Sequence, residues 1–324
     1  MSAPSRLYSA VDAAREGGGA SVALVCVIVT YNPAPDVVAR ELAALPTGSA
    51  VVIVDNASSA DAVDALAVIV QARQRAFLQR NSRNIGLAAA VNQGVKVAHN
   101  AWPTARFLLL LDQDSEPVPD SVELLMEAHE RLSAAGEAVG AVGPALLDVH
   151  TGLRHGFHQR GLWTWRRVHP DPQTNQPVAC ANLNGSGTLM RMSLFLELGG
   201  LAEAFFIDHV DTEWAFRLTA AGYGLWGIPK ATFMHRMGEH SMRIWFFGWR
   251  VWPSRTPQRH YFLFRNAILL LRTEHVPGIW KNWAVVKLLF TACLHGVCDS
   301  RRFEQWRFML RGVLDGIRYR DCQP

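Results

Sequence analysis

An uninterrupted apolar run that ends in two carboxylates constrains this chain more than any other feature. Residues 107–111 are Phe-Leu-Leu-Leu-Leu, and Asp112-Gln113-Asp114 follow directly. Such a run predicts a β-strand that is buried on both faces, as in the parallel sheet of an α/β protein. These sheets bind ligands at the carboxyl ends of their strands, where Asp112 and Asp114 would lie. The two carboxylates suit Mg²⁺ or Mn²⁺ beside a phosphate, although aspartate is also common in turns and helix N-caps.

Strands and helices are expected to alternate before this motif. The alternation predicts a parallel, doubly wound sheet with right-handed crossovers. Beyond it, residues 147–178 are irregular and indicate an insertion or strand pair near an acceptor cleft, and the chain from Trp245 onward is expected to be mostly helical. The other expected strands are 24–29, 51–54, 77–78, 139–142, 205–207, 225–228 and 231–234, and the expected helices start near Pro35, Asp61, Leu87, Ser121, Ser193 and Trp214.

Composition divides the chain into three parts and limits its partners. Residues 1–20 are Gly-rich, lack the apolar core of a signal peptide and are expected to form a flexible N-terminal tail. Residues 21–242 form the expected catalytic domain, and residues 243–324 the mostly helical C-terminal region. Five cysteines without a Cys-x-x-Cys pair indicate reduced thiols and a cytoplasmic location. The net charge of +4, without a Lys/Arg run, gives no indication of nucleic-acid binding. The apolar stretch 283–298 is interrupted by Lys287 and His295 and is short for a membrane span, which favours an amphipathic or buried helix.

Polar motifs follow one another at the expected strand ends and in the loops between residues 22 and 272. In chain order they are Thr30-Tyr31-Asn32, Asp55-Asn56, Arg83-Asn84-Ile85-Gly86, Asp112-Gln113-Asp114, Asn184-Gly185-Ser186-Gly187-Thr188, Asp208-His209-Val210-Asp211-Thr212-Glu213-Trp214, His235 and Arg265-Asn266. This series resembles the family 2 glycosyltransferases of the GT-A fold, and most of all their bacterial rhamnosyltransferase branch.

The resemblance implies a role for each motif. Asp211 matches the catalytic base, and Asp114 with His235 matches the metal ligands for Mg²⁺ or Mn²⁺, with His240 as a second candidate. The family's usual Glu-Asp pair is Val210-Asp211 here, so the base lacks its acidic neighbour. The implied donor-nucleotide residues are Thr30, Tyr31, Asn32, Asp55 (to the pyrimidine N–H), Asn56, Arg83, Asn84, Gly86, Asp112 and Gln113, and the implied acceptor or supporting residues are Gly185, Ser186, Asp208, Glu213 and Trp214.

Several of these residues also have ordinary structural explanations. Asp211 could cap the helix that follows it, and Asp208 could be the base in its place. Asp55 could close an Asx-turn with Asn56 and Ser58, and His235 could be a hydrogen-bonded residue at a strand end.

The implied activity is inverting sugar transfer, in which an acceptor hydroxyl attacks the anomeric carbon and a nucleoside diphosphate leaves. The metal would neutralise the diphosphate, and a carboxylate would accept the hydroxyl proton. The favoured donor is dTDP-L-rhamnose and the favoured acceptor a growing bacterial polysaccharide or lipid-linked oligosaccharide. UDP-galactofuranose or UDP-glucose as donor, and a non-catalytic nucleotide- or glycan-binding scaffold, are the alternatives. Arginines and tryptophans between residues 243 and 265 indicate either a surface helix pair at an anionic membrane or an oligomer interface.

Overall fold

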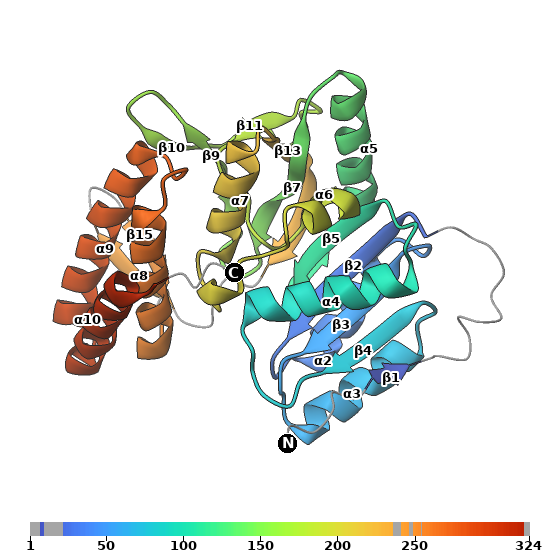
Figure 1. Cartoon of the computed structure of the whole chain (residues 1–324), viewed down its shortest axis with the longest axis horizontal. Coiled ribbons are helices and arrows are strands. Elements are labelled where there is room, and N and C mark those ends of the chain that lie inside the picture. Colours follow the sequence, from blue (N-terminus) through green and yellow to red (C-terminus); the bar gives the residue numbers. More distant parts are fainter. Residues whose placement is uncertain (1–6, 10–21, 236–240, 246–248, 254, 321–324) are drawn as a thin grey trace.

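A single large sheet forms the centre of the molecule (Figure 1). The computed structural model describes residues 7–9, 22–235, 241–245, 249–253 and 255–320. Four parallel strands lie in the order β4-β3-β2-β5, and their residues are almost fully excluded from solvent, as the apolar runs predict. These strands are β2 (Leu24–Thr30), β3 (Ala50–Asp55), β4 (Ala76–Arg80) and β5 (Phe107–Asp112).

Helices cover both faces of this sheet because successive strand residues point to opposite sides. Val25 and Val27 of β2 belong to one apolar cluster, together with α4 (Leu87–Ala101), α6 (Met192–Glu197) and α7 (Val210–Ala220). Cys26 and Ile28 belong to the opposite cluster, together with α2 (Pro35–Ala44), α3 (Ala60–Gln71) and α5 (Ser121–Ala134). The expected doubly wound arrangement is therefore confirmed.

The second half of the sheet is mixed. Strand β12 (Thr188–Arg191) runs antiparallel between β5 and β7 (Val139–Asp148), and β13 (Gly224–His235) is parallel to β7. The two short strands expected at 225–228 and 231–234 are one strand, whose pairing with β7 shifts between Ile228 and Thr232, next to Pro229, which has no N–H to donate. The remaining strands of this sheet are β1 (Leu7–Ser9), β6 (Ser115–Pro117), β8 (Arg154–His155) and β11 (Val178–Cys180).

Two segments follow the sequence expectation only in part. The irregular segment contains the expected strand pair, formed by β9 (Phe157–Arg160) and β10 (Trp165–Val168). The strand expected at 205–207 is wrong, because Glu203–Phe205 form the 3-10 helix η1 and Phe206 has a φ of 58°. Within the expected N-terminal tail, the structure describes Leu7–Ser9, which pair with β4.

The C-terminal region begins with a hairpin and continues with three helices. The expected helix pair is wrong for residues 241–253, which form β14 (Ser241–Trp245) and β15 (Trp249–Pro253). Alternating arginine with Ile, Val and Trp favours a strand over a helix. The helices α8 (Pro257–Arg272), α9 (Gly278–Cys298) and α10 (Arg302–Arg318) lie together at one end of the molecule (Figure 1), and α9 includes the helix expected at 283–298. Across the described ranges, none of the helices is long and apolar enough to cross a membrane.

Candidate active site

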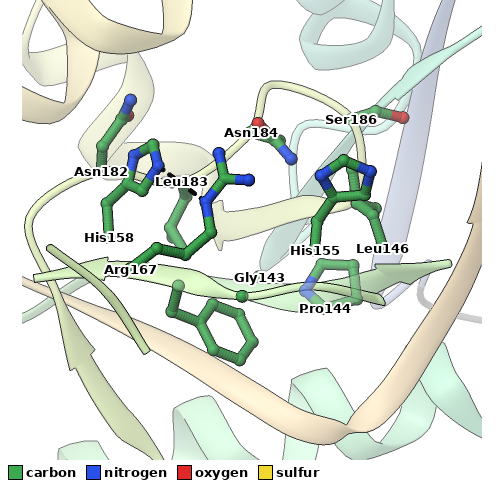
Figure 2. Close-up of a pocket in the computed structure, with 12 residues that line it drawn as sticks. Gly143, Pro144, Leu146, His155, His158, Arg167, Asn182, Leu183, Asn184 and Ser186 are labelled. Carbon is green, nitrogen blue, oxygen red and sulfur yellow. Dashed lines mark hydrogen bonds between the residues drawn. The ribbon is translucent and has the colours of Figure 1, made fainter. Parts of the chain in front are cut away.

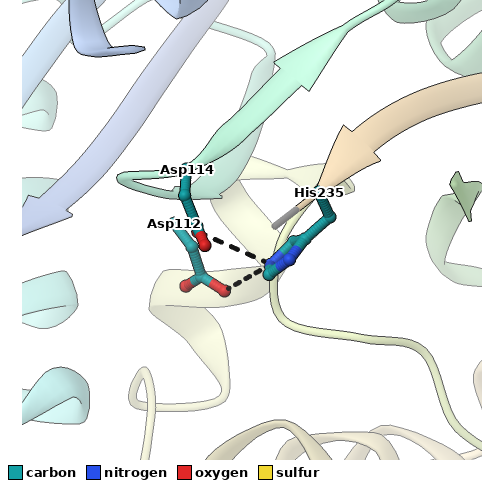
Figure 3. A group of neighbouring side chains, drawn as sticks. All are labelled: Asp112, Asp114 and His235. Atoms are coloured by element: carbon teal, nitrogen blue, oxygen red, sulfur yellow. Dashed lines mark ion pairs between the residues drawn. The ribbon is translucent and has the colours of Figure 1, made fainter. Parts of the chain in front are cut away.

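Two aspartates and one histidine meet at the carboxyl edge of the sheet (Figure 3). Asp112 ends β5, Asp114 lies in the following turn, and His235 ends β13. Strand β6 connects them, because Ser115 pairs with His235 in the sheet. The His235 Nε2 atom lies 3.5 Å from Asp112 Oδ2 and 3.6 Å from Asp114 Oδ1. The sequence motif and the distant histidine therefore form one cluster.

The donor set of this cluster fits a divalent cation. One ligand atom from each side chain can be chosen so that all lie within 4.8 Å of one another. Neighbouring ligands of an octahedral ion with bonds of about 2.1 Å lie about 3 Å apart, so small side-chain rotations would close the cluster around an ion. Carboxylate oxygens suit Mg²⁺ and Mn²⁺, and the imidazole nitrogen favours the softer Mn²⁺. His240, the second candidate, lies outside the described residues.

The carboxylate of Asp211 lies near this cluster, at the start of α7. Asp211 is the second residue of the helix and His209 is its N-cap, so the proposed capping role of Asp211 is wrong. Its Oδ1 accepts a hydrogen bond of 2.7 Å from the Thr212 N–H. Burial raises the pKa of Asp211 to about 6, the Thr212 N–H opposes this, and the negative charge of Asp112 adds to it. A carboxyl group of this pKa is deprotonated at neutral pH and is a stronger base than an ordinary aspartate.

The loop before Asp211 has an unusual backbone that is held by one buried amide. Phe206, Asp208 and His209 all have positive φ, between 58° and 63°. Asn266 of α8 is fully buried, and its Nδ2 group donates to the carbonyls of residues 205, 207 and 208 at 2.6–2.8 Å. The sequence analysis included Asn266 in the series of motifs but assigned it no role. Its contacts make it the residue that fixes the path of the chain into the base.

Asp208 is an ion-pair residue rather than a base. Arg259 Nε lies 2.9 Å from its Oδ2, and Arg255 Nη1 lies 2.5 Å from its Oδ1. Burial opposes ionisation of Asp208, but the two guanidinium groups outweigh it and hold its pKa below the usual value. The hypothesis that Asp208 replaces Asp211 as base is therefore disfavoured, whereas its role in holding the loop agrees with these contacts.

Glu213 and Trp214 stabilise the fold rather than line the site. Glu213 accepts two hydrogen bonds from Arg217, of 2.9 and 2.8 Å, and Arg217 also donates to the carbonyls of Leu198 and Gly200 at 2.7 Å. Trp214 is buried in the core beside Phe195. Of the two roles considered for Glu213, acceptor contact and structural support, these contacts favour support.

The loop that contains Gly185 and Ser186 joins the two halves of the site. The Asp112 N–H donates to Ser186 Oγ at 3.1 Å, and the hydroxyls of Ser186 and Ser115 are hydrogen-bonded. A Cβ atom at Gly185 would lie 3.8 Å from the Cβ of Asp211. The loop therefore lies between the metal cluster and the base, where the transferred sugar would have to fit.

On the proposed donor side, β2 and β3 end in a network of side-chain bonds. Asp55 is fully buried, and its carboxylate accepts from the N–H and hydroxyl of Ser58 and, at 3.4 Å, from the hydroxyl of Thr30. The turn-closing role of Asp55 is therefore present, and its contact with a pyrimidine stays a prediction. The Tyr31 N–H donates to Gln113 Oε1 at 2.7 Å, which ties the end of β2 to the aspartate motif. Asn32 joins the same turn through bonds of 2.7 Å to Ser58 and 3.0 Å to Ser59.

Asn56, Asn84 and Gly86 form the adjoining loop. Asn56 Nδ2 donates to Asn84 Oδ1 at 2.9 Å and to the Gly86 carbonyl at 3.3 Å. Gly86 caps α4 with a φ of 89°, and a Cβ atom there would lie 2.6 Å from the Phe206 ring. The donor loop therefore contacts the loop of the base, and glycine is required at the contact. Arg83 is exposed beside this loop, where it is available to a phosphate.

A polar pocket opens beside Ser186, and its lining includes His155, His158, Arg167, Asn182 and Asn184 (Figure 2). Arg167 Nε donates to His158 Nε2 at 3.0 Å, and burial together with the Arg167 charge lowers the pKa of His158 to about 4. Asn182 Nδ2 donates to Thr212 Oγ1 at 3.3 Å, next to Asp211. Sequence analysis predicted an acceptor cleft in this part of the chain but did not assign these side chains.

A mixed sheet with an Asp/Asp/His cluster at its carboxyl edge and a buried carboxylate beside it defines the class of GT-A sugar transferases. The fold is shared with GalNAc-T7, solved with UDP, GalNAc and Mn²⁺, at a TM-score of 0.59 and 15% identity over 90% of this chain and 55% of that chain. It is also shared with the mannosyltransferase PcManGT of Pyrobaculum calidifontis, solved with GDP-Man and Mn²⁺, at a TM-score of 0.53 and 15% identity over 92% of this chain and 88% of the other.

Sequence similarity defines the family. The model of glycosyl transferase family 2 matches residues 25–199. The dTDP-rhamnosyl transferase RfbF of Shigella flexneri is 30% identical over 306 residues, which cover 91% of this chain and 95% of that protein. The N-acetylglucosaminyl-diphospho-decaprenol L-rhamnosyltransferase of Mycobacterium tuberculosis is 28% identical over 285 residues, 80% of this chain and 86% of the other. The chain belongs to glycosyltransferase family 2, as its strand-end motifs predict, and its function is sugar transfer.

Proposed function

We propose that this enzyme transfers L-rhamnose from dTDP-L-rhamnose to a hydroxyl of a bacterial polysaccharide or lipid-linked oligosaccharide, with inversion at the anomeric carbon and with Mn²⁺ or Mg²⁺. One observation carries the mechanism: Asp211, a buried carboxylate of raised pKa at the start of α7, lies near the Asp112, Asp114 and His235 cluster. The names of the two relatives support the donor, and the second also supports an acceptor on a lipid diphosphate. We place the enzyme in the cytoplasm, at the inner face of the membrane.

Each residue has one task in this proposal. Asp112, Asp114 and His235 would hold the metal, which would supply positive charge to neutralise the leaving diphosphate. Asp211 accepts the proton of the acceptor hydroxyl as that oxygen attacks, a contribution of roughly 10²–10⁴-fold to the rate. The polar pocket beside Ser186 holds the acceptor sugar through the hydrogen-bonding groups of its lining, among them Asn182, Asn184 and Arg167. A carboxylate base separate from the residues of the metal cluster supports inversion in a single displacement.

The donor and the metal can be tested together by calorimetry with dTDP, UDP and GDP, with and without Mn²⁺. Metal-dependent preference for dTDP, lost in Asp114→Asn and His235→Ala, is expected. Asp64→Asn, which changes an exposed carboxylate of α3 outside the cluster, serves as a control for charge removal. Preference for UDP would replace the donor by a UDP-hexose or UDP-galactofuranose. If none of the three nucleotides bound, the enzyme proposal would give way to a scaffold.

The reaction itself requires a separate measurement. Incubation with dTDP-L-rhamnose and an N-acetylglucosaminyl-diphospho-polyprenol acceptor is expected to release dTDP and to give a rhamnosylated lipid whose anomeric configuration, measured by NMR, is inverted. A product that retains the configuration of the donor would contradict the role of Asp211 as a base.

A further inference from the structure

Helix α10 exposes a continuous apolar stripe to solvent. Phe303 is 82% exposed, and Leu310 and Ile317 are each 58% exposed. With 100° per residue, the stripe covers less than a quarter of the helix circumference, because its members recur at intervals of three and four residues. The opposite side of the helix packs on α8 through two glycines, so the stripe is not the face that holds α10 in the fold. The stripe consists of Phe303, Trp306, Leu310, Leu314 and Ile317.

Helix α9 extends the same surface. Val286, Leu289 and Val297 are between 63% and 75% exposed, and they too recur on one side of their helix. The two stripes join at Trp306, whose ring lies so close to Gly296 that a Cβ atom there would overlap it. Exposed apolar patches of this extent on two packed helices mark an interaction surface. We call the seven exposed residues of α10 and α9 together with Trp306 the apolar face.

Arginines lie along the border of this face. Arg307, Arg311 and Arg318 follow one side of the α10 stripe and Arg302 the other. Within the described ranges, Arg302, Arg307 and Arg318 form no ion pair, whereas Arg311 lies 3.5 Å from Asp315. A stripe of apolar residues flanked by unpaired arginines is typical of a helix that lies in the interface of an anionic bilayer. The aliphatic parts of the arginine side chains then lie along the acyl region, and the guanidinium groups contact the headgroups.

We infer that the apolar face docks the enzyme on the surface of an anionic lipid bilayer. Neither helix is able to span a membrane, so the contact is with the surface. A second copy of the chain fits less well, because a symmetric dimer would bring the same arginine borders together. The first turns of α9 pack against the catalytic part, where Trp280 contacts His209 and Trp283 contacts Trp165. Docking through α9 would therefore place the site beside the bilayer.

This inference extends the membrane location proposed above, and its test requires neither donor nor acceptor, so its failure would leave the sugar-transfer proposal intact. The full chain is sedimented with vesicles of phosphatidylcholine alone, or of phosphatidylcholine with an equal part of phosphatidylglycerol. We expect binding to the anionic vesicles. Phe303→Ser with Leu310→Ser should weaken it at least about tenfold, because both side chains would leave the acyl region. Val68→Ser, which changes a residue of α3 with 68% exposure, is the matched control and should bind as the wild type does.

The charge contribution is tested separately. Arg307→Gln and Arg318→Gln should each weaken binding to the anionic vesicles about fivefold and leave any binding to neutral vesicles unchanged. Lys96→Gln, which changes an exposed residue of α4, is the control. The inference is wrong if the wild type binds neither kind of vesicle, or if the Phe303/Leu310 variant binds as tightly as the wild type. A dimer in sedimentation that Leu310→Ser dissociates, without lipid binding, would assign the face to a second copy and overturn the proposal.

Discussion

Replacing Asp211 by asparagine is expected to abolish catalysis and to stabilise the fold. The pKa of this carboxyl is raised from 3.8 to about 6, so its ionised form is less favourable in the folded than in the unfolded state. About two pKa units at 1.36 kcal/mol each give an upper limit of about 3 kcal/mol at pH 8. The hydrogen bond from the Thr212 N–H becomes a neutral one, which costs about 1 kcal/mol. The net gain is therefore about 1–2 kcal/mol, or about 2–4 °C in Tm.

The sign of this effect depends on pH in a defined way. The ionised Asp211 carboxylate lowers the free energy of unfolding. This loss of stability is absent below the unfolded pKa of 3.8, grows as the pH rises to about 6, and is constant above that. Thermal unfolding in a chelator at pH 8 should therefore show the gain, which should vanish near pH 4. Asp208→Asn is the matched control with the opposite sign, because the pKa of Asp208 is lowered and its loss leaves Arg255 and Arg259 without their partner.

The transfer assay completes the test of Asp211. Turnover of Asp211→Asn should fall by roughly 10²–10⁴-fold while dTDP binding stays close to that of the wild type, since the proposed role of the residue is to accept a proton from the acceptor. Turnover within tenfold of the wild type, or a Tm at pH 8 that is unchanged or lower, would refute the assignment of a buried base.

Two further substitutions test the loop that leads to the base. Asn266→Ala removes three buried hydrogen bonds and should lower stability by about 2–4 kcal/mol and kcat more than nucleotide affinity. Arg73→Ala, which removes the hydrogen bonds to Leu42, Pro46 and Ser49 in another part of the fold, should lower stability alone, and equal kcat losses in both would contradict a positioning role. Gly86→Ala should cost about 1–3 kcal/mol and weaken dTDP binding, because its Cβ would overlap Phe206, whereas Gly136→Ala, with a similar φ but open space, should leave dTDP binding unchanged.

Local sequence patterns predicted the first half of the fold well because each of its strands is an apolar run that can be recognised from its own residues. The four parallel strands are buried apolar runs, and the Asp112-Gln113-Asp114 motif follows the last of them, as expected. The hairpin at 241–253 was mistaken for helix because bulky apolar residues with arginines occur in both structures, and only their alternation separates the two. The 3-10 turn at Glu203–Phe205 has no local signal, since the side chain that holds the next residues comes from α8.

The site was predictable as a set of motifs but not as a set of contacts. Asp114 and His235 were paired only through family resemblance, and the pairing of β6 with β13 provides the physical reason for their proximity. The roles of Asp208 and Glu213 could not be distinguished from the sequence. Asp208 is neutralised by Arg255 and Arg259, which lie before and within α8, and Glu213 is neutralised by Arg217, one turn further along α7. Arg167 and His158 lacked a periodic or motif signal, and their roles depend on the pocket that they share.

The position of β12 between β5 and β7 has a consequence for synthesis of the chain. Until residues 188–191 have left the ribosome, β5 has a partner on one side alone, and its other edge presents the backbone of residues 107–110 unpaired. A long apolar edge of this kind is a template for pairing with other chains. Fragments that stop short of β12 therefore retain the four parallel strands and yet end in an unpaired apolar edge, and His235, which completes the cluster with Asp112 and Asp114, is synthesised only after that edge has been covered.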